Sequence, residues 1–311
     1  MGLQGKRLAA FAVALVVATA ALVGAALLIG SGGLDGALIA TLRAPRVLAA
    51  AGVGALLALS GLAMQVLLRN PLADPYVLGT SGGASVGALI AMIAGTSLWL
   101  GAAAGALLAG ALLLALARSA LATSDDASTR LILTGAMIAA VTGALATLLL
   151  TITPDERLRG AIFWLVGDLS GARHGVVCLG AAAVFALLLW LRRRSVDRLL
   201  LGAEAAALLG EPVRRLRYEL LVAASLAAAL GVATAGAIGF VGLVVPQLLR
   251  AAGVQRTREL AWMSALGGAA LLVGADLAAR TLAAPLELPV GAVMALIGAP
   301  LFIAFLIRSA P

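Results

Sequence analysis

The chain has 311 residues, of which 63% are hydrophobic and 12% are charged, with a mean hydropathy of +1.11. Soluble domains carry about 25% charged residues, so this composition excludes an ordinary soluble domain and indicates a membrane protein with several crossings. The formal charge of +8, from 22 Lys and Arg against 14 Asp and Glu, fits the basic loops that orient membrane proteins better than it fits nucleic-acid binding.

Ten apolar segments are long enough to cross a bilayer at roughly 20 residues each. The first starts behind Lys6 and Arg7 like a signal peptide, but its length favours an uncleaved crossing. No charge separates two of the later segments at Gly236 to Gly239, and without that break the C-terminus would lie on the other side. The ten segments lie near residues 8–30, 46–68, 79–95, 97–117, 130–151, 174–191, 218–236, 239–253, 259–282 and 290–307.

The distribution of basic residues supports ten crossings with both termini in the cytoplasm of an inner-membrane protein. Sixteen of the 22 basic residues then lie inside, and the six outside are Arg43, Arg46, Arg157, Arg159, Arg173 and Arg280. Arg43 and Arg46 have no acidic residue nearer in sequence than Asp35. We therefore expect them to be exposed outer cations on which an acidic partner docks.

Two segments outside the bilayer have a structure of their own. On the outer side, residues 153–169 combine a turn with an amphipathic stretch, which predicts a short helix at the interface. On the inner side, residues 195–217 contain leucines at helical spacing and end their apolar run at Gly210 and Pro212, which predicts a loop with short helices. This inner loop fits either an anchor on anionic lipid or a docking surface for a cytoplasmic protein.

The chain also contains a weak inverted repeat. SGLAMQVLLRNP, ending at Pro71, aligns with AGAIGFVGLVVP, ending at Pro246, so that Gly61 falls on Gly236. The two copies run in opposite directions across the bilayer, as in transporters that open alternately to each side.

Glycines at positions 79, 83 and 87 share one helix face and favour close helix packing. The same stretch matches the G-x-S-x-G pattern of a serine hydrolase at Ser81, but the only histidine, His174, is expected on the opposite side of the membrane. With Cys178 the only cysteine, no zinc cluster is expected, and with Lys6 the only lysine, no P-loop is expected. We predict no catalytic residue, no metal site and no cofactor.

Four motifs follow one another along the chain: R-A-P-R from Arg43, the stretch from Ser60 to Ala84 with S-G-L-A-M-Q and R-N-P-L-A-D-P-Y-V-L-G-T-S-G-G-A, L-G-A-E-A-A-A-L-L-G from Leu201, and G-A-I-G-F-V-G-L-V-V-P-Q-L-L-R from Gly236. In this combination and order they resemble the FecCD/BtuC-like permease family, the transmembrane subunits of type II ABC importers for iron-siderophores, haem and cobalamin. The resemblance covers nearly the whole chain. One departure is Gln247, where the family usually has His after the Val-Pro pair.

The resemblance implies an all-α fold of about ten transmembrane helices, with residues 1–311 forming a single permease domain. It implies a second permease copy, two cytoplasmic ATPase subunits and a substrate-binding protein on the outer face. It also implies three sets of site residues. These are binding-protein docking by Arg43, Arg46 and Arg280, a cytoplasmic gate of Asn70, Leu72, Ser128 and Thr129, and ATPase coupling by Leu201, Gly202, Glu204, Ala205, Leu209 and Gly210.

The resemblance therefore predicts a permease that moves a siderophore, haem or cobalamin without changing it, with ATP hydrolysed by a partner chain. Iron complexes come first because they form the larger part of the family. The alternative is an ion-coupled secondary carrier of a small apolar solute, which a proton relay of buried acids would favour. The acidic residues Asp74, Asp168, Asp276 and Glu287 lie near predicted segment ends, which argues against that relay.

Overall fold

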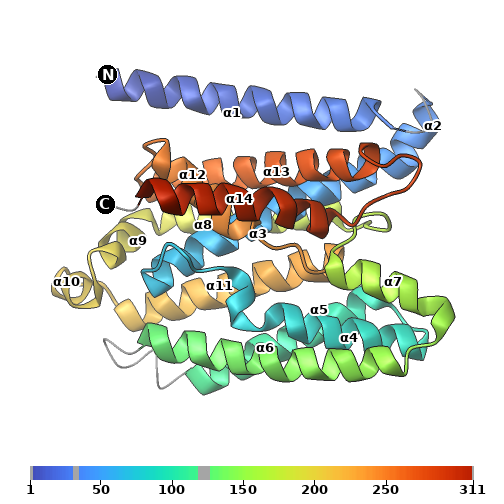
Figure 1. The fold of residues 1–311 in the computed structure, drawn as a ribbon. Coiled ribbons are helices and arrows are strands. Elements are labelled where there is room, and N and C mark those ends of the chain that lie inside the picture. The colour runs from blue at the N-terminus through green and yellow to red at the C-terminus, as the bar shows by residue number, and fades with distance from the viewer. Residues whose placement is uncertain (1–2, 31–34, 118–126, 310–311) are drawn as a thin grey trace.

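The computed structural model describes residues 3–30, 35–117 and 127–309, and within them all regular structure is helical. Figure 1 shows the long helices running side by side between two ends of a bundle. They are α1 (Leu3–Leu28), α3 (Ala44–Leu68), α4 (Thr80–Ala94), α5 (Leu98–Ala117), α6 (Ala127–Thr151), α8 (Gly175–Leu191), α11 (Val213–Ala235), α12 (Val241–Ala251), α13 (Thr257–Thr281) and α14 (Val290–Ser309). The elements that connect these ten helices are α2 (Gly36–Leu38), η1 (Ile39–Arg43), η2 (Pro75–Leu78), α7 (Asp155–Val166), α9 (Arg193–Leu200) and α10 (Ala203–Leu208).

One long helix falls on each of the ten predicted crossings. Among the described residues, six helices are long and apolar enough to span a membrane, the α8–α9 pair is a bent candidate, and α4, α12 and α14 are shorter apolar helices, which together make ten. A helix is the expected form because lipid offers no partner for unpaired backbone groups. The break between the seventh and eighth crossings is confirmed, since Gly236 and Phe240, both with φ of 69°, separate α11 from α12.

Helix α3 is the centre of the bundle. The share of its apolar window that is buried within the protein is 89%, against 6% for α1. It packs against α8, α11, α12 and α13, and glycines let these helices approach closely. A Cβ atom on Gly61 would lie 2.0 Å from the carbonyl oxygen of Gly242 in α12. A larger residue at Gly61 would therefore push α12 away from α3.

The predicted glycine face does pack, mainly between α4 and α5. A Cβ on Gly83 would lie 2.4 Å from the Gly105 oxygen, and a Cβ on Gly87 would lie 2.1 Å from the Gly101 oxygen. Gly79 differs because it has φ of 74° at the junction of η2 and α4, and it contacts Ile138 of α6. The α4–α5 hairpin and α6 thus form one flank of the bundle.

The two ends of the bundle carry different elements. The ribbon places the N-terminal end of α1, the C-terminal end of α14 and the helices α9 and α10 at one end, and α2 and α7 at the other (Figure 1). We call the first the α10 end and the second the α7 end. Both short-helix segments predicted outside the bilayer are therefore helical, and they lie at opposite ends. The two copies of the repeat differ locally, because Pro71 follows the end of α3 whereas Pro246 lies inside α12.

Candidate functional site: the two ends of the bundle

The arginines at the α7 end are buried in an ion-pair cluster. The Nε of Arg46 lies 2.8 Å from Oδ1 of Asp276, and its NH1 lies 2.7 Å from Oε2 of Glu287. Arg280, one helical turn beyond Asp276 in α13, brings its Nε to 3.1 Å from Oδ2 of the same carboxylate. The cluster joins α3, α13 and the segment that leads to α14.

Two of these arginines also bind the end of α1. NH1 of Arg43 donates to the carbonyl oxygens of Leu27 and Leu28, each at 3.1 Å, and NH2 of Arg280 donates to that of Ala26 at 3.1 Å. The last carbonyls of a helix have no partner within it and carry partial negative charge, so guanidinium groups stabilise them. The arginines therefore fix the position of the C-terminal end of α1.

This geometry corrects the expectation that Arg43 and Arg46 are exposed cations without acidic partners. Only 7% of Arg43 and 8% of Arg46 is exposed. The acids that bind Arg46 are 230 and 241 residues away in sequence, so the distance to Asp35 was the wrong criterion. Asp35 instead accepts a hydrogen bond from the backbone N–H of Ala37 at the start of α2. The docking role itself stays a prediction.

An opening beside the cluster still gives a partner access to it. A cavity of about 330 Å³ is lined by Arg43, Arg46, Arg280 and Glu287, among others. The Glu287 side chain is 50% exposed, whereas the Arg46 side chain is 10% exposed. Three arginines against two carboxylates leave the cluster one positive charge in excess. Glu287 is therefore the more accessible of the two carboxylates that pair with Arg46, since the Asp276 side chain is only 1% exposed.

At the α10 end, two glutamines connect α3, α12 and the segment after α3. Nε2 of Gln247 donates to Oε1 of Gln65 and to the carbonyl oxygen of Pro71, both at 2.9 Å. Nε2 of Gln65 donates to the carbonyl oxygens of Gly242 and Leu243 at 3.2 and 3.4 Å. Both glutamine side chains are buried. Gln247 thus holds the segment that contains the predicted gate residues against α12.

Replacement of Gln247 by leucine is expected to lower the stability of the permease by about 1–3 kcal/mol, because buried acceptors on Gln65 and Pro71 would lose their donor. Replacement by histidine should cost less, since a neutral imidazole still supplies one N–H. Thermal unfolding of the purified permease in detergent measures both changes. Equal melting temperatures for the leucine variant and the unchanged protein would contradict the role of this hydrogen-bond network.

The predicted gate residues lie in two places at the α10 end. Oδ1 of Asn70 accepts from the backbone N–H of Leu72 at 2.9 Å, and the Leu72 side chain is 46% exposed. Ser128 and Thr129 lie in the first turn of α6, where Thr129 is exposed. Figure 1 places the start of α6 at the same end as the segment between α3 and α4. The gate role of all four residues remains a prediction.

Asp74 caps the short helix that follows. Its Oδ1 accepts from the backbone N–H of Tyr76 at 2.8 Å, and the Tyr76 hydroxyl donates to the carbonyl oxygen of Ile238 at 2.7 Å. Burial raises the pKa of Asp74 to about 6, although the hydrogen bond from Tyr76 opposes this rise. These contacts hold η2 against the break between α11 and α12.

The predicted coupling residues form a small projection at the α10 end. Gly202, with φ of 119°, turns the chain from α9 into α10, and Gly210, with φ of 80°, follows α10. Figure 1 shows α10 projecting from the bundle. The side chains of Leu201, Leu209 and the neighbouring Leu208 are 65%, 53% and 90% exposed, Glu204 is exposed, and Ala205 is half-buried. Exposed leucines on a projecting helix are typical of a protein contact surface.

The projection is tied to the bundle by polar contacts. Arg198 forms an ion pair with Glu211, Arg192 lies 2.9 Å from Glu219 of α11, and Asp197 accepts from the backbone N–H of Thr257 at 3.1 Å. These contacts attach helix α9 to α11 and α13.

Arg69 is a connecting residue that the sequence analysis missed. It ends α3 in the left-handed conformation with φ of 49°, immediately before the predicted gate residue Asn70. Its guanidinium lies beside Gly202, because a Cβ built there would be 3.5 Å from NH1. The end of α3 thus touches the turn of the coupling segment. Arg69 is the first residue of the R-N-P motif, and a non-glycine residue there gave no indication of the left-handed conformation.

The described residues do not bring a hydrolase site together. His174 stacks on Trp99 at the start of α5, with ring centroids 4.4 Å apart. The α4–α5 register, with Gly83 against Gly105 and Gly87 against Gly101, places Trp99 about eight residues along α4 from Ser81. Eight residues of helix extend about 12 Å, so His174 cannot reach Ser81 as a base. No group of three or more His, Cys, Asp or Glu that could hold a metal occurs among the described residues.

A family model, the FecCD transport family, matches residues 7–308. The chain belongs to this family. It is 42% identical over 283 residues to the vitamin B12 import system permease protein BtuC of Vibrio vulnificus, covering 88% of this chain and 83% of the relative. It is 40% identical over 277 residues to the ABC transporter permease protein YvrB of Bacillus subtilis, covering 86% of this chain and 78% of the relative.

Solved structures agree with this assignment. A metal-chelate type ABC transporter in an inward-facing conformation matches with a TM-score of 0.86 and 28% identity, covering 95% of this chain and 98% of that one. PsaBC from Streptococcus pneumoniae matches in fold alone, with a TM-score of 0.58 and 16% identity. The FecCD-family chain is therefore a multi-pass permease of an ABC importer in the inner membrane, and it is a transport component and not an enzyme.

Proposed function

We propose that this permease imports cobalamin. The observation that carries the proposal is the identity of 41–42% to vitamin B12 import permeases across nearly nine tenths of the chain. This identity favours cobalamin as the cargo over the iron complexes, which the resemblance alone put first. The second candidate is another metal chelate, siderophore or haem, which the structural similarity to a metal-chelate type transporter favours at the lower identity of 28%.

The proposed importer contains a second copy of this permease, two cytoplasmic ATPase subunits and an outer substrate-binding protein. In this arrangement the α10 end and both termini face the cytoplasm, and the α7 end faces outward. The exposed leucines of α10 would contact the ATPase. The contact between Arg69 and Gly202 would carry ATPase movement to the gate segment at Asn70 and Leu72, so that cobalamin could leave toward the cytoplasm.

Docking of the binding protein would exchange one of the two carboxylate partners of the buried Arg46. A carboxylate of the binding protein would take the place of the half-exposed Glu287 on Arg46, while Asp276 keeps its own contact. The exchange would make docking sensitive to Glu287 and would keep Arg46 neutralised when no partner is bound.

Replacement of Glu287 by glutamine is expected to tighten docking of the binding protein by up to about fivefold, since it removes an internal competitor worth about 0.2–1 kcal/mol. Surface-bound permease titrated with the binding protein measures this affinity. Replacement of Glu219 by glutamine removes an ion-paired carboxylate at the other end and is the matched control. Weaker docking in the Glu287 variant, with the control unchanged, would contradict the exchange.

The cargo is tested by competition. Vesicles containing the permease, its ATPase and its binding protein are supplied with ATP and radiolabelled cobalamin, and unlabelled cobalamin, haem or a ferric hydroxamate chelate is added in excess. We expect labelled cobalamin to accumulate and only unlabelled cobalamin to reduce it. The same vesicles are also supplied with a radiolabelled iron chelate in place of cobalamin. Accumulation of this chelate without accumulation of cobalamin would overturn the cobalamin assignment and favour the second candidate.

A further inference from the structure

Two adjoining spaces separate α1 from the rest of the bundle. A pocket of about 640 Å³ lies at the α10 end, and a groove of about 390 Å³ continues along α1 toward the middle of the bundle. Phe11 lines both. The pocket is lined by Arg7, Phe11, Arg256, Glu259 and the turn of residues 252–255, whereas the groove is lined by apolar residues of α1, α12, α13 and α14.

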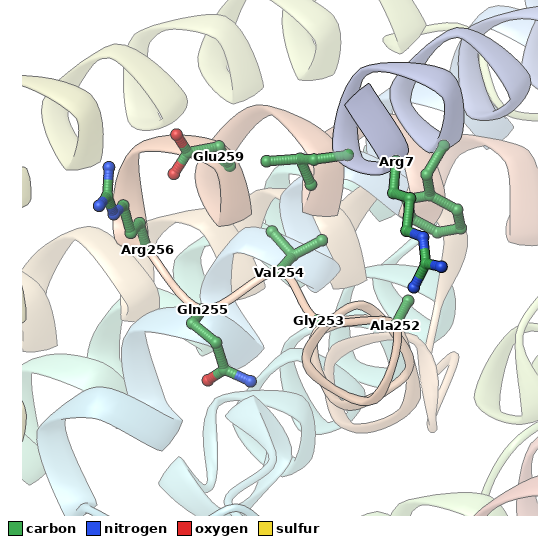
Figure 2. Close-up of a pocket in the computed structure, with 9 residues that line it drawn as sticks. Arg7, Ala252, Gly253, Val254, Gln255, Arg256 and Glu259 are labelled. Carbon is green, nitrogen blue, oxygen red and sulfur yellow. The ribbon is translucent and has the colours of Figure 1, made fainter. Parts of the chain in front are cut away.

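The pocket carries the charges of a zwitterionic ligand. Figure 2 shows Arg7 of α1 on one side, Arg256 and Glu259 on the other, and the turn of residues 252–255 between them. The arginines offer donors to an anionic phosphate. Oε2 of Glu259 is buried and has no hydrogen-bond partner among the described residues, so this oxygen can accept from a ligand. The volume lies within the range of about 300–1,000 Å³ that is usual for small-molecule pockets.

The groove has the length of one lipid chain. Phe11, Leu15 and Leu22 line it from the same face of α1. From Phe11 to Leu22 the helix rises about 16 Å at 1.5 Å per residue, which is about half of the roughly 30 Å hydrocarbon core of a bilayer. Arg7 lies one turn beyond Phe11, at the headgroup end. The charged pocket and the apolar groove therefore follow each other as a headgroup and its acyl chains do.

Small residues on α13 keep the groove open. Gly267, Ala270 and Gly274 line it at helical spacing. A Cβ added to Gly274 would only reach ordinary contact distance from Leu22, at 3.8 Å. A larger side chain at this position would therefore occupy the groove without forcing α1 and α13 apart at the backbone.

We propose that a phosphatidylethanolamine molecule occupies this site, with its phosphate at Arg7, its ammonium group at Glu259 and an acyl chain in the groove. The ligand would fill the gap along α1, whose contacts with the bundle are otherwise mainly with α13 and the arginines at the α7 end. A second copy of the chain would fill the apolar groove but would not account for the charges of the pocket.

The test is native mass spectrometry of the purified transporter titrated with phosphatidylethanolamine or phosphatidylglycerol of identical acyl chains. We expect saturable binding of phosphatidylethanolamine, and about fivefold weaker binding in Arg7→Gln, which removes the cation at the phosphate. Gly274→Leu should also weaken binding, whereas Gly180→Leu, at an exposed position of α8 with open space around it, should leave it unchanged.

Glu259 determines which lipid headgroup the site prefers. Its replacement by glutamine should remove the preference for phosphatidylethanolamine over phosphatidylglycerol. Equal or tighter binding of phosphatidylglycerol to the unchanged protein would overturn the ethanolamine assignment. Unchanged lipid binding in both Arg7→Gln and Gly274→Leu would overturn the site. Loss of dimers without loss of bound lipid in Gly274→Leu would also overturn it.

Discussion

Replacement of Arg46 by glutamate is expected to prevent accumulation of folded permease. The substitution would place a third carboxylate beside Asp276 and Glu287, where only Arg280 would remain within ion-pair distance of Asp276. Loss of one partner from a buried ion pair costs about 3–5 kcal/mol, which is a large part of the usual total stability of about 5–15 kcal/mol. Detergent extraction followed by size-exclusion chromatography measures the yield of folded protein.

Two controls separate this effect from a general effect of charge. Arg173→Glu makes the same charge change at an exposed position near the α7 end and should leave the yield unchanged. The double variant Arg46→Asp with Asp276→Arg exchanges the two charges and should recover part of the yield. A normal yield for Arg46→Glu would mean that the cluster contributes little to folding. It would restore the view of Arg46 as a free docking cation.

Replacement of Leu208 by aspartate is expected to separate ATP hydrolysis from uptake. Leu208 is 90% exposed on α10, so the change leaves the interior of the permease intact and alters only the surface that we propose contacts the ATPase. Burial of a leucine contributes about 1.5–3 kcal/mol, so its loss should weaken ATPase binding about 10- to 100-fold. Co-purification of the ATPase and the ratio of transported substrate to hydrolysed ATP measure the effect.

Further variants test the same surface. Glu204→Arg changes an exposed charge on α10, and Gly210→Pro cannot keep the φ of 80° or the hydrogen bond from its N–H to Ala207. Both should reduce uptake per ATP. Leu282→Asp introduces the same change as Leu208→Asp at a 72% exposed position beyond the opposite end of α13 and should leave ATPase binding unchanged. Normal coupling in all three α10 variants would place the ATPase contact elsewhere.

The crossings could be predicted from the sequence because their signal is local. An uninterrupted apolar run in lipid has to form a helix, so each of the ten runs predicts a helix without reference to the rest of the chain. The same holds for the glycine face of α4, where the absence of side chains allows α5 to approach. The break after α11 was harder, yet the glycines at 236 and 239 gave the correct position.

The polar contacts could not be predicted in the same way because their partners are remote in sequence. Arg46 pairs with residues 230 and 241 positions away, and Gln247 pairs with a residue 182 positions away. One signal was available for the arginines. The predicted topology already placed Asp276 and Glu287 on the same side as Arg46, so a comparison of membrane depth would have found acids that sequence distance did not.

The most direct measurement is uptake of labelled cobalamin by vesicles that contain the permease, its ATPase and its binding protein, with and without ATP. For a permease of an ABC importer, we expect cobalamin to accumulate only with ATP and both partner proteins. The accumulated amount should be lower in Leu208→Asp. Accumulation without ATP, driven by a proton or sodium gradient across vesicles that contain this chain alone, would contradict it and identify an ion-coupled carrier.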